Sequence, residues 1–329
     1  MGNEGDATTT RFADSLALPV CGAVESATVP AAAKRGEAVK LGIDEAGRGP
    51  VLGAMTFGTC YWALSEDAAI ERDQKAIDDS KQLTEDARAR LFERIAADGR
   101  MGWAVDVVSA AKLSAEMLRV APTSLNAISF DATCRLIRRV QARGVTVAEA
   151  FVDTVGDPDA YRARLDRAFD GAIAFTVAKK ADALYKCTGA ASICAKVCRD
   201  LSLERWAYDE PTVRDRDFGS GYPSDDVCKR WLARNVDAVF GYPTLALLLA
   251  DGEDGPRRHR AGRRERAAAP RRPGPLGRGR RGRRGRLDHE DHRVRHRRQE
   301  EERDAPRQEA QARPLLPRPR QPDRARLIN

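Results

Sequence analysis

The chain has 329 residues, enough for one large domain or two of ordinary size. Its net charge of +8 is unevenly distributed: residues 251–329 carry 25 Arg, no Lys and 13 acidic residues, whereas residues 1–250 carry 32 basic and 36 acidic residues. All four histidines lie in the basic segment, so catalytic schemes that pair serine or cysteine with histidine are disfavoured for the body of the chain.

The seven cysteines indicate a reducing compartment. Their number is odd, none forms a C-x-x-C pair, and most lie within apolar segments, so we interpret them as buried thiols and not as disulfides or zinc ligands. No apolar run reaches the roughly 18 residues that a membrane span needs. The N-terminus also lacks the pattern of a secretion signal. We therefore expect a soluble, intracellular protein.

The first part of the chain predicts an unstructured leader followed by three strands. Residues 1–37 contain alanine, threonine, glycine and charged residues without sustained periodicity, which is typical of disorder. Strands are expected over 38–44, about 54–63 and 101–109. A short helix is expected over 65–72, and a longer one over 84–96 begins at the capping residue Thr84.

The second part alternates strands and helices. Strands are expected over 147–152 and 173–178, and helices over about 124–143, 158–169, 190–208 and 225–236. Three early strands followed by this alternation predict an α/β domain with a mixed five-stranded sheet flanked by helices. We place this domain at residues 38–243.

The character of the sequence changes after Pro243. Residues 244–329 are dominated by Arg, Gly and Pro, and such a composition cannot bury a core. One interpretation is a disordered basic tail. The other is a frame-shifted translation of a GC-rich gene, which the absence of lysine from residues 251–329 favours.

Acidic residues follow three of the predicted strands. Asp44 and Glu45 end the first strand, Asp153 ends the fourth, and Asp182 lies just past the fifth. Because the ends of neighbouring strands converge, these carboxylates can face one another, and they would repel unless a cation lies between them. Oxygen ligands without His or Cys suit Mg²⁺ or Mn²⁺, and two such ions can stabilise the entering and leaving oxygens of an in-line displacement. Any one of the four, taken alone, could instead be a turn former or helix cap.

A glycine-rich turn follows the first acidic pair. Gly47, Arg48 and Gly49 offer backbone N–H groups and a guanidinium, both suited to an anion. The turn does not fit a dinucleotide-binding fingerprint, because its spacing is G-x-G-x-x-x-G and a strand, not a helix, is expected after it. Acids for a metal beside donors for a phosphate predict phosphodiester chemistry.

Two further features are ambiguous. Lys196 and Arg199 share one face of a predicted helix near Asp182, either as a solvated face or as part of a phosphate-binding rim. Tyr222 lies in the glycine-rich loop 218–223, either as a packed turn residue or as a ring and hydroxyl offered to a sugar.

These motifs, in this order, resemble the type 2 ribonuclease H family, and in particular the eukaryotic catalytic subunits of ribonuclease H2. The resemblance covers about residues 41–243 and is carried by LGIDEAGRGPVLGAM, DSKQL, SLNAISFD, FVDTVGDP, KKADALY, AASICAKVCRD, FGSGYPSD and VFGYP. It implies an RNase H-like fold with a C-terminal helical extension. It also implies an endoribonuclease that cleaves the RNA strand of RNA–DNA hybrids and nicks 5′ of single ribonucleotides in duplex DNA, leaving 3′-hydroxyl and 5′-phosphate ends.

The resemblance also assigns residues. The metal-binding acids of the family match Asp44, Glu45, Asp153 and Asp182, with two Mg²⁺ or Mn²⁺ ions as cofactors. The motif that reads the ribose 2′-hydroxyl matches Gly47, Arg48 and Gly49, and the loop tyrosine that contacts the same hydroxyl matches Tyr222. Lys81 and Asn126 fall in substrate-contacting segments.

The resemblance further implies a nuclear protein of DNA replication and ribonucleotide excision repair, with two non-catalytic partner subunits, B and C. The sequence after Pro243 departs from the family, which leaves this partnership open. Two alternatives are a non-catalytic nucleic-acid-binding paralogue and another phosphoryl transferase of the RNase H fold, such as a resolvase or transposase. The four acids disfavour the first, and the Gly-Arg-Gly turn and Tyr222 disfavour the second.

Overall fold

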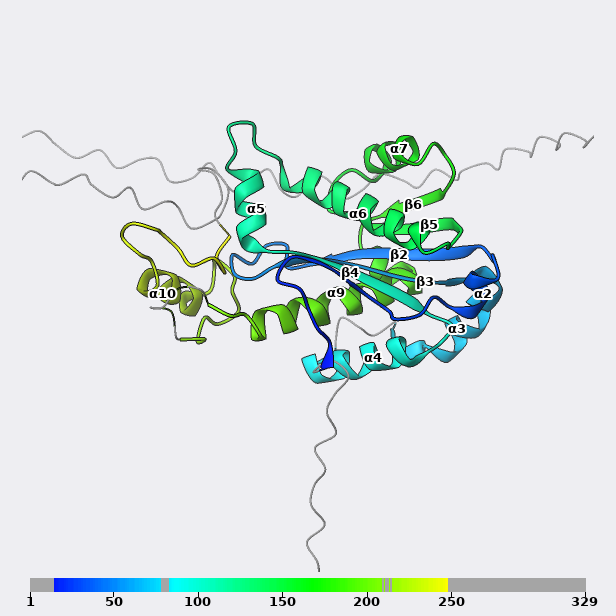
Figure 1. Cartoon of the computed structure of the whole chain (residues 1–329), viewed down its shortest axis with the longest axis horizontal. Helices are drawn as coiled ribbons and strands as arrows, with labels where there is room; N and C mark the ends of the chain where they lie inside the picture. The colour runs from blue at the N-terminus through cyan, green and yellow to red at the C-terminus, as the bar shows by residue number, and fades with distance from the viewer. Residues whose placement is uncertain (1–14, 78–82, 209, 211–212, 214, 248–329) are drawn as a thin grey trace, which may run out of the picture. The chain divides into compact units, whose positions relative to one another are not determined.

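A six-stranded sheet in the order β1-β4-β3-β2-β5-β6 organises the part of the chain that the computed structural model describes, residues 15–77, 83–208, 210, 213 and 215–247 (Figure 1). The strands are β1 (Gly22–Glu25), β2 (Val39–Ala46), β3 (Met55–Ala63), β4 (Gly102–Val108), β5 (Val147–Asp153) and β6 (Ala174–Ala178). The helices are α2 (Ala31–Lys34), α3 (Asp67–Asp73), α4 (Glu85–Ala97), α5 (Ala110–Met117), α6 (Leu125–Ala142), α7 (Pro158–Ala168), α8 (Ala181–Leu184), α9 (Lys186–Glu204) and α10 (Asp226–Arg234), with 3₁₀ turns η1 (Leu64–Glu66) and η2 (Lys75–Ile77).

The strand pairing confirms the predicted mixed sheet. β2, β3 and β4 pair antiparallel, whereas β5 pairs parallel with both β2 and β6. Along the chain, helices connect the parallel strands, as crossover connections require. The predicted α/β, RNase H-like class is therefore correct, although the sheet has one strand more than expected.

Helices cover both faces of the sheet (Figure 1). On one face, α9 and α4 bury a cluster that includes Trp62, Phe92 and Trp103. On the other face, α6 and α7 bury a second cluster that includes Phe130, Leu165 and Phe175. Since β2 lies inside the sheet and is covered by α9, its C-terminal end is held rigidly at the point where the first acidic pair begins.

Gly58 allows α9 to lie directly on the sheet beside Asp44, its cross-strand partner. A Cβ atom at Gly58 would lie 2.3 Å from the backbone oxygen of Ala191 in α9. Gly58→Ala should therefore lower the free energy of unfolding by about 3 kcal/mol, measured by chemical denaturation. Gly99→Ala is the control, because a Cβ there meets no atom within 4 Å. Equal stability of the two variants would show that this close approach does not matter.

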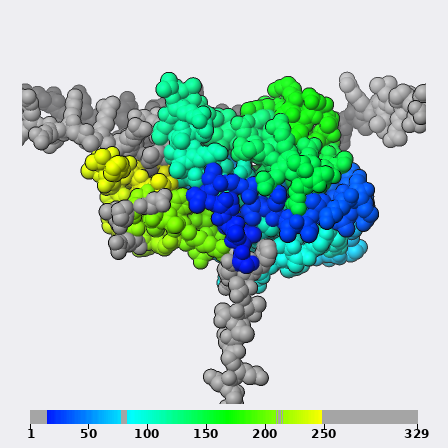
Figure 2. All heavy atoms as spheres, viewed as in Figure 1, coloured from blue at the N-terminus to red at the C-terminus, as the bar shows by residue number. Residues whose placement is uncertain are grey.

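The predicted disordered leader is wrong for part of its length, and residues 1–14 lie outside the described ranges. β1 pairs antiparallel with β4 and forms the sixth strand, at the edge of the sheet. Glu25 in β1 forms an ion pair with Arg139 in α6, with 2.7 Å between the carboxylate oxygen and the guanidinium nitrogen. Figure 2 shows this segment, in dark blue, on the surface below the teal α5 and α6. A four-residue strand without alternation gives too weak a pattern for detection from the sequence.

The predicted boundary at Pro243 is also too early. Leu245, Ala246 and Leu247 are buried, and the backbone N–H of Leu247 donates to the Val51 carbonyl at 2.8 Å. Leu245 and Ala246 join a cluster around Trp231 of α10, the helix that forms the predicted C-terminal extension, whereas Leu247 packs in a separate cluster with Met55 and Phe57 of β3. Residues 248–329, where the basic tail was expected, lie outside the described ranges. No described helix is long and apolar enough to cross a membrane.

Candidate active site

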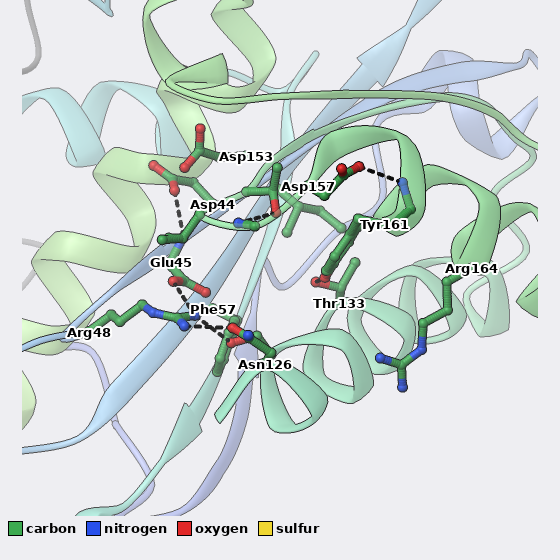
Figure 3. A pocket seen from close by; sticks show the side chains of 16 residues that line it. Asp44, Glu45, Arg48, Phe57, Asn126, Thr133, Asp153, Asp157, Tyr161 and Arg164 are labelled. Carbon is green, nitrogen blue, oxygen red and sulfur yellow. Dashed lines mark hydrogen bonds and ion pairs between the residues drawn. The ribbon is translucent and has the colours of Figure 1, made fainter. Parts of the chain in front are cut away.

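Asp44 and Asp153 converge because of the strand register. Ile43 of β2 pairs with Val152 of β5, so the following residue on each parallel strand is one of the two acids. Their carboxylates point toward the same space at the end of the sheet (Figure 3). The structure therefore brings together the two acids predicted from separate strand ends.

Burial makes Asp44 an unusual acid. Its side chain is almost fully buried, and this burial, with the negative charges of Asp153 and Asp182, raises its pKa from 3.8 to about 7. A hydrogen bond from the backbone N–H of Glu45, at 2.7 Å, opposes this shift. Asp44 therefore binds a proton easily at neutral pH unless a cation takes its place.

Glu45 points away from this pair toward the glycine-rich turn (Figure 3). Its carboxylate accepts a hydrogen bond from Arg48 at 3.2 Å, and Arg48 also donates to Asn126 of α6 at 2.6 Å and to Ser129 at 3.4 Å. Burial raises the pKa of Glu45, and the charge of Arg48 partly offsets that rise. Arg48 thus ties the turn, an acid of the site and α6 into one network.

Asp182 lies in the short helix α8 and not in a loop. Lys180, just before α8, has a positive φ of 59°, a backbone conformation that costs energy for a residue with a side chain. This turn directs the N–H of Ala181 to the Asp153 carboxylate at 2.7 Å. Asp182 does not line the cavity that Asp44 and Asp153 share, but its negative charge helps to raise the pKa of Asp44. The helix α8 therefore positions Asp182, and the N–H of its first residue, Ala181, holds the Asp153 carboxylate in place.

The glycine-rich turn needs its glycines. Gly47 and Gly49 have φ values of 84° and 106°, which favour glycine. A Cβ at Gly47 would lie 2.3 Å from the Ala54 carbonyl oxygen, and one at Gly49 would lie 3.3 Å from the Tyr222 ring. The turn is therefore packed closely against both the start of β3 and the tyrosine loop.

The loop that carries Tyr222 is fixed at both ends. The N–H of Val51 donates to the Gly221 carbonyl at 2.8 Å, and Asp225, the N-cap of α10, accepts hydrogen bonds from the backbone N–H and hydroxyl of Ser220 at 2.8 and 2.7 Å. These bonds from Ser220 lower the pKa of Asp225 to about 2. Tyr222 is 47% exposed, and its ring lies beside the turn.

Three basic residues predicted to bind substrate have different positions. The guanidinium of Arg199 is 15% exposed, and it contacts Asp200 at 3.3 Å and the Leu52 carbonyl at 3.4 Å. Arg199 therefore supports the backbone that follows the glycine-rich turn. Lys196 is half-buried and does not line the cavity. Lys81 lies outside the described residues.

A cavity of about 220 Å³ lies beside the acids, and neither Tyr222 nor the two glycines of the turn line it. Asp44, Glu45, Arg48, Asn126 and Asp153 all line it, as predicted site residues. Sequence reasoning missed a second group of lining residues from α6, α7 and the loop after β5, which includes Thr133, Thr154, Asp157, Tyr161 and Arg164. The Thr and Asp that flank Val-Gly in the DTVGD segment were the available signal for part of this group.

The chemistry of the acidic residues fits a hard divalent cation. All four candidate ligands are carboxylates, two of them have raised pKa values because of burial, and the charges of Asp153 and Asp182 destabilise the ionised form of Asp44. Among the described residues, no group of three or more His, Cys, Asp or Glu side chains is placed so that it could hold a metal ion. The structure thus brings Asp44 and Asp153 together, whereas Glu45 is turned toward Arg48 and Asp182 does not line the same cavity.

Comparison with known proteins agrees with this geometry. The profile of the family described as ribonuclease HII matches residues 41–245. The ribonuclease H2 A subunit of Homo sapiens is 46% identical over 219 residues, which cover 66% of this chain and 72% of the relative. The corresponding A subunit of Arabidopsis thaliana is 47% identical over 207 residues, which cover 62% of this chain and 69% of the relative.

A solved structure shows the same fold. The crystal structure of ribonuclease H2 from Pyrococcus horikoshii superposes with a TM-score of 0.51 at 28% identity and covers 63% of this chain and 92% of its own. Because the family profile matches residues 41–245 and the eukaryotic A subunits are 46–47% identical, the chain belongs to the ribonuclease HII family, in the branch that contains the A subunits of eukaryotic ribonuclease H2.

Proposed function

We propose that this ribonuclease H cleaves the RNA strand of RNA–DNA hybrids and also nicks duplex DNA on the 5′ side of a single embedded ribonucleotide. Its activity as a ribonuclease H follows from its family. The observation that supports the finer proposal is the juxtaposition of two elements. The Asp44–Asp153 pair lies next to a glycine turn that is itself packed against the exposed Tyr222.

Asp44, Glu45, Asp153 and Asp182 would hold two divalent cations, Mg²⁺ or Mn²⁺. When bound, these ions would supply a water that ionises readily and positive charge at the leaving 3′-oxygen. Hydrogen bonds within the protein hold three of these carboxylates in place. The N–H of Ala181 orients Asp153, the N–H of Glu45 orients Asp44, and Arg48 orients Glu45. Release of the 3′-oxygen would leave a 3′-hydroxyl and a 5′-phosphate.

Selection of a ribonucleotide would depend on the turn and the tyrosine. A 2′-hydroxyl donates and accepts hydrogen bonds, and it distinguishes RNA from DNA at a single position. The Gly47–Gly49 turn offers backbone groups beside the Tyr222 ring, and the Tyr222 hydroxyl can donate or accept. A deoxyribose would leave these groups without a partner, which favours strong rejection of DNA.

A panel of three duplexes of one sequence tests this proposal. One has an RNA strand opposite DNA, one has a single ribonucleotide in DNA, and one is DNA only. With Mg²⁺, we expect cleavage of the first two, on the 5′ side of the ribonucleotide in the second, and no cleavage of the third. Cleavage of the hybrid alone would contradict the proposed action on single ribonucleotides.

Tyr222→Phe should impair cleavage at a single ribonucleotide more than cleavage of a long hybrid. The single site depends on one 2′-hydroxyl, whereas a hybrid offers many ribose contacts. We expect kcat/KM to fall about tenfold or more at the single ribonucleotide, the cost of one hydrogen bond from a partly buried polar group. Equal losses on both substrates would contradict the proposed role of the Tyr222 hydroxyl.

Removal of ribonucleotides and RNA primers from DNA in the nucleus, with two non-catalytic subunits of the H2 type, completes the proposal. Its support is the similarity to the eukaryotic A subunits. Co-expression of the chain with B and C subunits, followed by size-exclusion chromatography, would test the assembly. A ternary complex is expected, and separate elution would contradict it.

A further inference from the structure

The cavity beside the acids continues to a second end that the proposed chemistry does not use. Thr133 of α6 and Tyr161 and Arg164 of α7 line this end, across the cavity from Asp44 and Asp153 (Figure 3). The hydroxyls of Tyr161 and Thr133 are 3.1 Å apart. Asp44 and Asp153 therefore lie at one end of the cavity and Arg164 at the other.

Arg164 is held in place by aromatic packing. Its guanidinium carbon lies 3.6 Å from the centre of the Phe130 ring, and Phe130 packs edge-to-face on Tyr161 at 5.7 Å. Phe130 is only 7% exposed, so the ring that supports Arg164 cannot move freely. A guanidinium that stacks on a ring by its face keeps its N–H donors at the edge, in the planar fork that matches a phosphate.

Arg164 also differs from the other arginines near the site. Arg48 forms an ion pair with Glu45, and Arg162 of α7 forms ion pairs with Asp159 and Asp166 at 3.7 and 3.6 Å. Within the described part of the chain, no carboxylate lies within ion-pair distance of Arg164. An exposed, immobilised guanidinium without a carboxylate is suited to an anion supplied by a ligand.

From this placement we propose that Arg164 binds a backbone phosphate of the nucleic acid duplex other than the one that is cleaved. The inference depends on the proposed function only in its choice of ligand, because Arg164 lines the same cavity as Asp44 and Asp153. Phosphates repeat along each strand, so a second phosphate is available there, and stacking on Phe130 reduces the entropy lost when Arg164 binds it.

Arg164→Ala tests the contact, with Arg162→Ala as the matched control on the same helix. Binding to a duplex with one ribonucleotide is measured with Ca²⁺ in place of Mg²⁺ to suppress turnover. Arg164→Ala should raise Kd about tenfold, the effect of one charge-assisted hydrogen bond. It should also reduce the slope of log K against log salt by about 0.9, the signature of one lost phosphate contact. The control should change neither quantity.

A scan with single neutral methylphosphonates identifies the phosphate. At one position, the modification should weaken binding by the wild type and leave binding by Arg164→Ala unchanged, because the contact is already lost. Arg164→Lys should fall between the two, since it keeps the charge and loses the fork. If Arg164→Ala binds like the control, or if the losses add at every position, the inference is wrong. Cleavage of the unmodified duplexes by the wild type remains a separate test of the proposed function.

Discussion

Asp153→Asn should lower the rate constant of cleavage by about 10³-fold or more. The substitution removes one negative charge from the acidic cluster, and charge stabilisation by a bound metal contributes several kcal/mol to such reactions. The fold should persist, because the amide oxygen of asparagine can still accept the hydrogen bond from Ala181, which is 2.7 Å long in the native protein. Single-turnover kinetics with saturating enzyme would measure the effect.

Asp157→Asn is the control for this experiment. Asp157 lines the same cavity, but its carboxylate caps α7 by accepting a hydrogen bond from Ala160 at 2.9 Å. Asparagine caps helices about as well as aspartate, so cleavage by this variant should stay near the wild-type rate. Normal turnover by Asp153→Asn would contradict the assignment of Asp153 to the metal site.

Asp44→Asn should stabilise the metal-free protein at high pH. The folded-state pKa of Asp44 is raised from 3.8 to about 7, so its contribution to stability is greatest below pH 4 and is lost as the pH rises toward 7. Asparagine cannot ionise and does not have this loss. Denaturation in chelator should show a gain on the order of 4 kcal/mol at pH 8 that vanishes near pH 4.

Addition of Mg²⁺ should stabilise the wild type more than Asp44→Asn. An ion that binds only the folded state stabilises it, and the wild type has the carboxylate to bind it. The melting temperature of the wild type should rise more with Mg²⁺ than that of Asp44→Asn. If Asp44→Asn were more stable than the wild type by the same amount at pH 4 and at pH 8, ionisation of the buried Asp44 carboxyl would not be the cause of the difference.

The central strands and the convergence of Asp44 with Asp153 could be predicted from the sequence. Each acid follows an apolar run that is long enough for a buried strand, and parallel neighbours bring such ends together. The helices α5 and α8 were not predicted. α5 has a recognisable N-cap, Ser109, but few polar residues to reveal a stripe, and α8 has only four residues.

Side-chain partners across the fold were beyond the sequence. Arg199 shares a helix face with Lys196, which predicted a phosphate rim, yet its contact with the Leu52 carbonyl depends on a turn 147 positions away. Similarly, the stack of Arg164 on Phe130 joins two helices that periodicity describes only one at a time. Patterns along the chain determine which elements form, whereas such contacts depend on how those elements pack.

Crystals of the protein grown with Mn²⁺ and a duplex that contains one ribonucleotide would show whether Asp44 and Asp153 hold a metal beside that ribonucleotide. We expect two anomalous scattering peaks, one of them within coordination distance of both Asp44 and Asp153, with the 2′-hydroxyl against Gly47, Gly49 and Tyr222. Manganese bound elsewhere, with Asp44 and Asp153 facing only solvent or protein, would contradict this expectation.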